Sequence, residues 1–297
     1  MCPSTLTHLK KPSWLKVKLP VGDKYHWLKK KSKELKLATV CEEAMCPNIG
    51  ECWSGGTATF MILGDVCTRG CRFCAVKTSR RPPMPDENEP AKLAQTLSEL
   101  TLDYVVLTTV DRDDLPDQGA GHISRCLEAI QISNPEMLIE ILMPDFSGEE
   151  PLIELVCAAK PAVLAHNVET VARLTSTVRD RRANYQQSLR VLAYAKKHHP
   201  TIYTKSSIMV GLGEKTEEII ETMQDLRKVG VDFLTIGQYL RPNLKFLPVA
   251  EYVHPDVFDN YEQEALAMGF KYAACGPLVR SSYRAGEYFM KSIIKTG

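Results

Sequence analysis

Six cysteines lie within 34 residues of this chain and constrain its fold and chemistry more than any other feature. They form two triplets: Cys67, Cys71 and Cys74 are spaced C-x-x-x-C-x-x-C, whereas Cys41, Cys46 and Cys52 are spaced C-x4-C-x5-C. Each triplet is one thiolate short of the four that close a tetrahedral metal site or a cubane iron–sulfur cluster. An iron without a fourth protein ligand can bind a small molecule, so the first triplet predicts an open metal centre.

A zinc site is the main alternative interpretation of these cysteines. It would pool four of the six, but neither spacing matches the paired C-x-x-C knuckles of structural zinc sites. Pro47, Asn48 and Gly50 exclude a regular helix between Cys46 and Cys52, which leaves a turn-rich loop that can wrap three thiolates around one centre. Unrelated buried thiols are a further alternative.

Length and composition describe an ordinary globular chain. With 297 residues, 44% of them hydrophobic and 25% charged, it can form one large α/β domain or two smaller ones. Its 37 basic residues nearly balance its 36 acidic residues, so we expect neither nucleic acid nor a membrane as a partner. No apolar run approaches the roughly 18 residues of a membrane span, and no apolar signal segment opens the chain. We therefore expect a cytoplasmic protein, a reducing setting in which clustered cysteines bind metal.

A strand-then-helix alternation begins at Thr57 and predicts the fold. The predicted strands are Thr57–Asp65, Tyr104–Val110, Leu138–Met143, Ala162–Asn167, Ile202–Val210 and Phe233–Gly237. The predicted helices are Pro90–Leu100, Ala120–Ile130, Glu149–Ala159, Val168–Leu174, Tyr185–Lys197, Thr216–Val229 and Pro255–Met268. Six such units predict an α/β fold with a parallel sheet and right-handed crossovers, a partial (β/α)6 TIM-like barrel with N-terminal and C-terminal extensions.

We expect three regions. Residues 1–56 form a basic arm and the first cysteine loop, residues 57–240 the partial barrel, and residues 241–297 a C-terminal extension. Residues 1–40 hold ten lysines against Asp23 and Glu34. The arm is either a solvated, partly helical extension or a docking surface for an acidic partner, with Trp14, Leu15 and Trp27 anchoring it to the body.

Polar residues follow several predicted strands, at the edge where parallel α/β folds place their chemistry. They are Thr109 and Asp111 after the second strand, His166 and Asn167 after the fourth, and Gly213 and Glu214 after the fifth, in which Lys205 also lies. Each has a structural alternative: a helix cap, a core histidine or a helix-entry loop. Their shared position favours a binding site.

The cysteine loop at residues 67–74, with Phe73 before its last cysteine, resembles that of the radical S-adenosylmethionine (SAM) enzymes. The additional triplet and the Arg-Ser-Ser-Tyr-x-Ala tail at Arg280–Ala285 are similar to the lipoyl synthase family over residues 38–286. Supporting stretches are Val110–Asp114, Glu140–Phe146, His166–Val171 and Met209–Glu214.

The resemblance implies two [4Fe–4S] clusters. Cys67, Cys71 and Cys74 would hold the first, whose open iron binds SAM for reductive cleavage to a 5′-deoxyadenosyl radical. Cys41, Cys46 and Cys52 would hold an auxiliary cluster, with Ser282 rather than Ser281 as the fourth ligand. The auxiliary cluster would donate sulfur to carbons 6 and 8 of a protein-bound octanoyl chain. The implied SAM contacts are Phe73, Thr109, Asp111, Asn167, Lys205, Gly213 and Glu214, with no catalytic residue beyond the cluster ligands.

The resemblance also implies partners. The substrate would be an octanoylated lipoyl carrier domain, from an E2 subunit or the glycine cleavage H protein, and the electron donor a ferredoxin or flavodoxin. Lipoyl domains are acidic around their lysine, which favours the docking interpretation of the basic arm. A radical SAM methylthiotransferase acting on tRNA or a ribosomal protein is the nearest enzyme alternative, although nothing after residue 240 resembles a nucleic-acid-binding domain. A structural zinc or iron–sulfur protein is the alternative that is not an enzyme.

Overall fold

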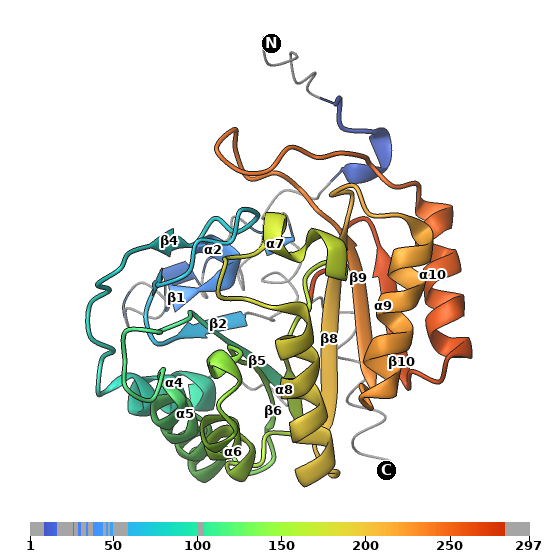
Figure 1. The fold of residues 1–297 in the computed structure, drawn as a ribbon. Coiled ribbons are helices and arrows are strands. Elements are labelled where there is room, and N and C mark those ends of the chain that lie inside the picture. Colours follow the sequence, from blue (N-terminus) through green and yellow to red (C-terminus); the bar gives the residue numbers. More distant parts are fainter. Residues whose placement is uncertain are drawn as a thin grey trace.

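One eight-stranded sheet organises the chain (Figure 1). The computed structural model describes residues 9–16, 26, 29–30, 34, 38–43, 46, 48–49, 59–99 and 104–282. In spatial order the strands are β1 (Ala38–Thr39), β2 (Thr59–Ile62), β5 (Tyr104–Thr109), β6 (Leu138–Leu142), β7 (Val163–Ala165), β8 (Tyr203–Val210), β9 (Phe233–Gln238) and β10 (Tyr272–Gly276). Strand β1 is antiparallel to β2, and every other neighbouring pair is parallel.

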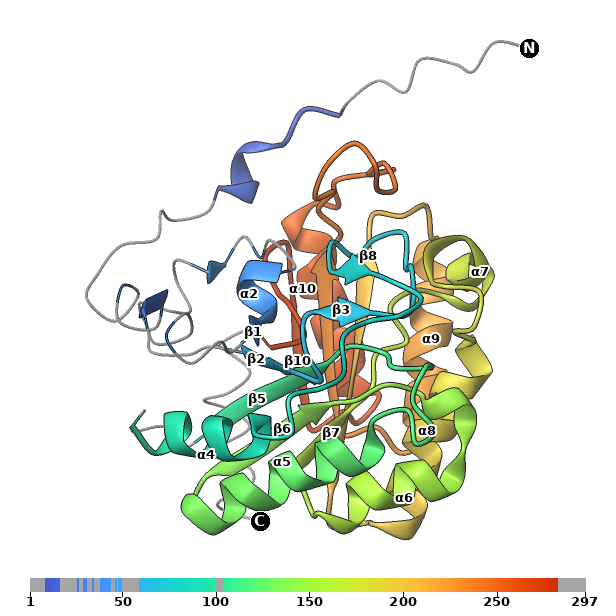
Figure 2. The ribbon, with the colours of Figure 1, turned by 90° about the vertical axis from the view of Figure 1, so that its left-hand side faces the viewer.

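Helices cover the outer face of this sheet. The longer ones are α4 (Glu89–Glu99), α5 (Ala120–Ser133), α6 (Glu150–Ala158), α8 (Tyr185–His198), α9 (Thr216–Lys228) and α10 (Pro255–Ala267). Figure 2 shows α4, α5 and α6 outside β5, β6 and β7. Short elements complete the chain: η1 (Ser13–Leu15), α2 (Val40–Glu43), β3 (Val66–Cys67), β4 (Lys77–Thr78), η2 (Phe146–Gly148), η3 (Ala172–Leu174) and α7 (Thr175–Val178).

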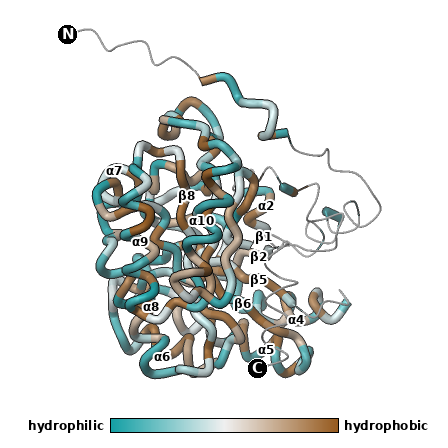
Figure 3. The backbone as a smooth tube through the Cα atoms, turned by 90° about the vertical axis from the view of Figure 1, so that its right-hand side faces the viewer, coloured by the Kyte–Doolittle hydropathy of each residue, from teal (hydrophilic) through white to brown (hydrophobic). Residues whose placement is uncertain are grey.

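Apolar residues at helical spacing explain how these helices pack. On α5, Ile123, Leu127 and Ile130 are fully buried, and they belong to a core shared with β5 and β6. A second core joins α8, α9 and α10 to β8 and β9. In Figure 3 the hydrophobic stretches coincide with the sheet, and hydrophilic stretches lie on the surrounding helices. Among the described residues, no helix is both long and apolar enough to cross a membrane.

The predicted partial barrel is confirmed in its six central strands, each lying within its predicted range or ending one residue beyond it. Strand β10 was not predicted; it pairs with β9 along five residues and adds a seventh parallel strand. The division into three regions stays a prediction. Strands β1 and β10 belong to the two flanking regions of that division, and both join the main sheet.

One predicted helix was wrong in its first half. Val168–Leu174 is helical only from Ala172, because Glu169 pairs in parallel with Ile208 beside β8. Glu169 has a left-handed backbone with φ of 66°. A residue held in a sheet bridge with positive φ cannot belong to a right-handed helix.

Candidate metal centre at the carboxyl ends of the strands

The first cysteine triplet lies on a loop closed by a small ribbon of its own. After β2 the chain turns at Leu63 and Gly64, both left-handed, and enters β3, which pairs with β4. Two backbone bonds fix the loop between these strands: Ser79 N–H to the Cys67 carbonyl at 3.0 Å and Cys74 N–H to the Cys71 carbonyl at 3.1 Å. The loop therefore leaves β2 at its carboxyl end, as the sequence predicts.

Backbone amides point at the sulfur atoms of this loop. Cys67 Sγ accepts hydrogen bonds from the amides of Arg69 and Asp111, both at 3.3 Å. Cys71 Sγ accepts one from the amide of Asp180, also at 3.3 Å. Hydrogen bonds to sulfur stabilise thiolates and tune iron–sulfur clusters. This donor set fits a cluster held by thiolates.

The three thiols also lie close enough to influence one another. Burial raises the pKa of Cys67 and of Cys71 to about 12, and that of Cys74 to about 11. Cys71 adds to the rise at Cys67, Cys74 to that at Cys71, and Cys67 to that at Cys74. Three buried neighbouring thiols are costly to ionise alone, but a bound metal deprotonates them as it binds.

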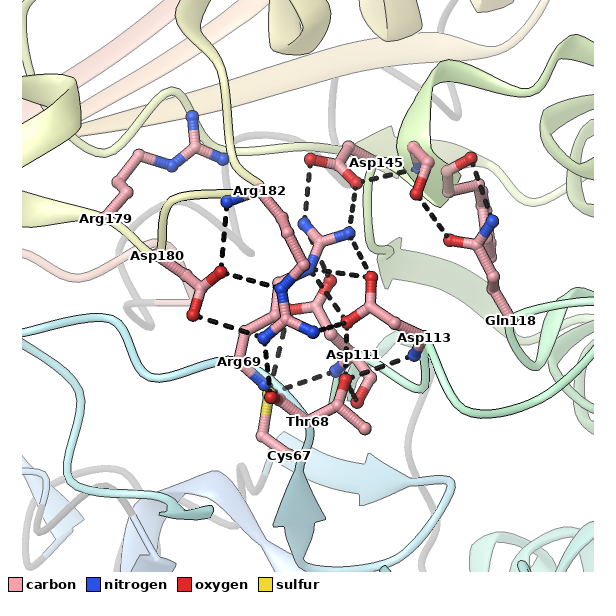
Figure 4. Close-up of polar contacts among 12 residues, drawn as sticks. Cys67, Thr68, Arg69, Asp111, Asp113, Gln118, Asp145, Arg179, Asp180 and Arg182 are labelled. Carbon is pink, nitrogen blue, oxygen red and sulfur yellow. Dashed lines mark hydrogen bonds and ion pairs between the residues drawn. The ribbon is translucent and has the colours of Figure 1, made fainter. Parts of the chain in front are cut away.

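A buried guanidinium sits at the centre of the site (Figure 4). The Arg69 side chain, 3% exposed, contacts three carboxylates. Its Nη2 lies 2.7 Å from Asp113 Oδ1 and 2.8 Å from Asp145 Oδ1, and its Nη1 lies 3.2 Å from Asp111 Oδ1. Arg182 adds a second cation, 3.3 Å from Asp113 and 2.8 Å from Asp180.

The carboxylates in this network differ in ionisation. Burial raises the pKa of Asp111 to about 6, with Arg69 opposing the rise and the neighbouring Asp145 and Asp113 adding to it. Burial also disfavours charge on Asp145, but hydrogen bonds and the charge of Arg69 outweigh it and lower that pKa to about 2. The negative charge of Asp111 is thus less well balanced by its surroundings than that of Asp145. Asp111 Oδ2 lies 3.7 Å from Cys67 Sγ.

The other predicted strand-end residues are placed as follows. Thr109 Oγ1 donates to the Leu142 carbonyl at 3.3 Å, and Asn167 Nδ2 donates to Glu169 Oε1 at 3.2 Å. Asn167 Oδ1 is buried and has no hydrogen-bond partner among the described residues, so it can accept from a ligand. Phe73 is half-buried on the cysteine loop itself.

Glu214 and Gly213 form a tight loop after β8. The Glu214 carboxylate accepts from the amides of Gly211 and Leu212, and Gly213 has a φ of 100°. The carboxylate therefore closes its own loop in this structure.

Lys205 is placed inside the sheet by an ion pair with Glu140. It is the third residue of β8, and its ammonium lies 2.8 and 3.0 Å from the two oxygens of Glu140. Tyr104 donates to the same carboxylate at 2.6 Å. The ion pair is almost completely buried, which indicates a structural role inside the sheet.

Several residues near the first triplet were missed, among them Asp180 and Arg182. Glu169 adds to the rise in the pKa of Cys71 and Cys74, and burial raises its own pKa. Arg179, also buried, donates to Ser188 Oγ at 2.9 Å and opposes the rise at Glu169. Glu169 stands two residues after Asn167, so the polar cluster after the fourth predicted strand could have indicated it. Arg179 has no comparable signal.

The second triplet meets the C-terminal extension. Cys41 lies on α2, and the amide of Cys46 donates to its carbonyl at 3.0 Å. Asn48 Nδ2 donates to the Leu278 carbonyl at 2.6 Å. Burial raises the pKa of Cys46, and the positive charge of Arg280 opposes that rise.

The tail reaches this place across the end of β9. A Cβ at Gly237 would overlap the carbonyl oxygen of Val279, so only glycine permits the crossing. Ser281 and Ser282 follow and are half-buried. Cys52 and residues 283–285 lie outside the described residues.

A third cluster of possible metal donors is already satisfied internally. The side-chain donors of Glu89, His122 and Cys126 are buried and lie within 4.8 Å of one another. However, Glu89 Oε2 pairs with His122 Nε2 at 2.6 Å and accepts from the Leu63 amide at 2.8 Å. Through Glu89, this cluster holds the left-handed turn that precedes the cysteine loop.

Two family models match this chain. Residues 61–226, more than half of it, match the family model of the radical SAM superfamily. Residues 4–46 match the N-terminal domain of lipoyl synthase of the radical SAM family.

Curated relatives cover almost the whole chain. The apicoplast lipoyl synthase of Plasmodium knowlesi is 58% identical over 286 residues, which are 96% of this chain and 65% of that protein. The mitochondrial lipoyl synthase of Arabidopsis thaliana is 55% identical over 293 residues, 97% of this chain and 78% of that protein. The chain thus spans about two thirds to three quarters of the length of these relatives.

Solved structures support the fold alone. The crystal structure of methylornithine synthase (PylB) matches with a TM-score of 0.56 and 13% identity, covering 89% of this chain and 82% of that one. Streptococcus suis SuiB bound to S-adenosylmethionine matches with a TM-score of 0.58 and 11% identity, covering 84% and 60%.

Proposed function

Because this chain belongs to the lipoyl synthase family of radical SAM enzymes, we propose that it inserts sulfur at carbons 6 and 8 of a protein-bound octanoyl chain. When bound, the two [4Fe–4S] clusters and SAM would supply a 5′-deoxyadenosyl radical and the sulfur. Removing hydrogen from an unactivated carbon exceeds the chemistry of protein side chains, so the protein contributes placement.

The observation that carries this proposal is the convergence of amide donors on the first triplet. Cys67, Cys71 and Cys74 would hold the radical-generating cluster, with Cys67 and Cys71 receiving the three N–H···S bonds described above. Asp111 and Asn167 are the strand-end groups best placed to bind SAM. Asp111 borders Cys67, and Asn167 has an unpaired buried oxygen.

Cys41, Cys46 and Cys52 would hold the auxiliary cluster. The hydrogen bond of Asn48 with Leu278 and the electrostatic effect of Arg280 on the pKa of Cys46 support this assignment, because they bring the serine-bearing tail towards the second triplet. Ser282 is the proposed fourth ligand in preference to Ser281. A neutral hydroxyl binds iron more weakly than a thiolate, so this position would be released first as sulfur is withdrawn.

The carrier would dock on the basic arm. Lys10, Lys11, Lys16 and Lys30 are exposed, whereas Leu15 is buried and the Trp14 ring contacts that of His254 edge-on, with centroids 5.1 Å apart. Exposed cations on an anchored segment fit an acidic lipoyl domain. A ferredoxin or flavodoxin remains the proposed reductant.

We infer a reducing compartment, because clustered cysteines bind metal where thiols stay reduced. The cytoplasmic prediction stands beside relatives named for the mitochondrion and the apicoplast, which makes an organelle the alternative. Imaging of the full-length protein in its own cell would decide between them.

Anaerobic assay with an octanoylated lipoyl-domain peptide tests the proposed function. After incubation with SAM and a reductant, mass spectrometry should show a gain of two sulfurs in the dithiol product, and of two sulfurs less two hydrogens once that product is oxidised in air to the cyclic disulfide. Iron and acid-labile sulfide should both be present in the protein. A protein that contains zinc and no sulfide would contradict the proposal.

A further inference from the structure

The turn after β6 is strained and faces the cysteine loop. Phe146, Ser147 and Gly148 are left-handed in succession, with φ of 47°, 53° and 79°. Only glycine adopts this conformation freely, and strained residues persist where their surroundings hold them. Phe146 is completely buried, so the turn is part of the packed body.

Gln118 holds this turn from the segment before α5. Its Nε2 donates to the Phe146 carbonyl at 3.3 Å and to Glu149 Oε1 at 2.9 Å, and its Oε1 accepts from Ser147 Oγ at 3.2 Å. Gln118 is itself buried and left-handed, with φ of 49°. Two strained segments, far apart in sequence, are therefore locked together by one side-chain amide.

The turn fixes the direction of Asp145. The Ser147 amide donates to Asp145 Oδ1 at 3.0 Å, which leaves both carboxylate oxygens facing Arg69. Asp145 Oδ2 accepts from Arg69 Nη1 at 2.9 Å, and Oδ1 lies 2.8 Å from Nη2 (Figure 4). Asp145 is fully buried, and a two-point contact with a guanidinium defines both distance and orientation.

Arg69 carries this constraint into the cysteine loop. It stands between Cys67 and Cys71, and its own amide donates to Cys67 Sγ at 3.3 Å. Its guanidinium is the cation that contacts Asp111, Asp113 and Asp145 together. Loss of that charge would leave excess negative charge beside Cys67.

We propose that Gln118, the strained turn, Asp145 and Arg69 form a positioning relay that fixes the Cys67–Cys71 loop and sets the charge beside its cluster. The relay rests on the proposed function, since it requires a cluster at Cys67, Cys71 and Cys74. Its members are positioning residues that act through the loop. The reduction potential of a cluster depends on local charge and on hydrogen bonds to sulfur, so the relay acts on both.

Opposite charge changes at the two ends of the Arg69–Asp145 contact test the electrostatic part. In a Cys41→Ala/Cys46→Ala background, which leaves the first cluster alone, its midpoint potential is measured by a redox titration followed by electron paramagnetic resonance. Arg69→Gln should lower the midpoint potential, because the carboxylates that Arg69 no longer neutralises destabilise the more negative, reduced cluster. Asp145→Asn removes a negative charge and should raise the potential. Unchanged potentials, or shifts of the same sign, would overturn the electrostatic role.

A comparison of two glutamines tests the positioning part. Gln118→Leu removes the bonds to the strained turn, whereas the control Gln131→Leu removes a bond of 2.7 Å to the Ala159 carbonyl at the far end of α5. Amide hydrogen exchange in residues 66–74 should accelerate about tenfold in Gln118→Leu and stay unchanged in Gln131→Leu. Equal behaviour of the two variants would reject the relay.

Different results would contradict the proposed function and the positioning relay. Absence of iron and sulfide from the unmodified protein would contradict the proposed function. Normal iron and sulfide there, with the exchange and the potentials unaffected in the variants, would contradict the relay alone. If Arg69→Gln does not assemble a cluster, the isosteric Asp145→Asn variant and the Gln118→Leu variant still decide the outcome.

Discussion

Asn48 donates a hydrogen bond of 2.6 Å to the carbonyl oxygen of Leu278 and so joins two points 230 residues apart in the chain. Asn48 is 3% exposed, two residues after Cys46. Leu278 follows β10 and precedes the tail with Ser281 and Ser282. This bond links the second cysteine triplet to the segment proposed to complete its cluster.

Removal of this bond should weaken the auxiliary site selectively. Asn48→Ala leaves the Leu278 carbonyl without its partner, and losing a part-buried hydrogen bond of this kind costs about 0.5–1.5 kcal/mol. We expect a chelator to remove iron from the auxiliary cluster faster than in the unmodified protein, with the first cluster unaffected. Mössbauer spectroscopy of iron-57 protein during chelation would follow both. Asn134→Ala, which loses a 3.4 Å bond to the Ala94 carbonyl, is the control.

The two triplets should separate functionally. Cys41→Ala should still cleave SAM to 5′-deoxyadenosine but form no lipoyl product, whereas Cys67→Ala should lose both activities. Liquid chromatography of 5′-deoxyadenosine and mass spectrometry of the carrier peptide measure the two steps. Cys157→Ala removes a buried thiol of the core outside both triplets and should retain both. Equal losses in Cys41→Ala and Cys67→Ala would show that the triplets do not divide the work.

The buried Lys205–Glu140 pair should behave as a structural unit. Lys205→Met leaves Glu140 without its cation, a change that costs about 3–5 kcal/mol in comparable buried pairs. The double variant Lys205→Met/Glu140→Gln should regain most of this stability, because glutamine still accepts from Tyr104. Urea unfolding measures both effects. If the double variant folds but fails to bind SAM, this result would support the direct contact between Lys205 and SAM that the resemblance implies.

His166 should make stability depend on pH. Its ring bonds to the Met143 carbonyl and Ser188 Oγ, each at 2.9 Å, and burial lowers its pKa to about 4 from an ordinary 6.5. The unfolded chain therefore binds a proton below pH 6.5 that the folded protein does not, so stability falls as the pH drops from 6.5 towards 4.

Between pH 7.5 and 5.5 this group should cost about 1.3 kcal/mol, at 1.36 kcal/mol for each pKa unit. Urea unfolding at the two pH values measures the loss of unfolding free energy. This loss should be smaller by that amount in His166→Gln, since glutamine does not titrate. An identical pH dependence in both proteins would exclude His166 as the source.

Charge reversal on the basic arm should weaken carrier binding alone. Replacement of Lys29, Lys30 and Lys31 by glutamate should raise KM for the octanoylated carrier several-fold, most strongly at low salt, because exposed charges are screened. SAM cleavage without carrier should stay constant. Lys197→Glu, an exposed site at the end of α8, is the control. An unchanged KM would favour the interpretation of the arm as a solvated extension. Lys31 lies outside the described residues.

Local sequence was enough to predict the central strands, and the prediction of the first metal site also rests on local sequence. The run Tyr104–Thr109 is apolar and β-branched, and the cysteine spacing is a property of one short loop. Strand β10 contains Tyr-Ala-Ala-Cys-Gly, whose small residues carry little strand preference. It forms because β9 offers an unpaired parallel edge, a tertiary cause that a local pattern does not contain.

The rest of the site depends on contacts between distant segments. Arg69 and Asp145 are 76 residues apart, and Gln118 reaches its strained turn across about 29. Three successive positive φ angles at Phe146–Gly148 contradict local preference for two of those residues. The contact of Lys205 with SAM stays a prediction from the resemblance, whereas its ion pair with Glu140 depends on another strand of the sheet and is not contained in the local sequence.

The Asn48–Leu278 bond sets an order in which the two sites can be completed during synthesis. The loop of the first triplet has its hydrogen-bond partners once the chain has been made as far as Leu247, whose amide donates to the Arg72 carbonyl at 3.1 Å. The second triplet has to wait for residues 278–282, which leave the ribosome later than the partners of the first triplet. Because a domain emerges from its N-terminus onwards, the cysteines translated first belong to the site that closes last. Between the two events the nascent protein carries exposed, unclosed thiols, and its maturation would depend on their protection during that interval.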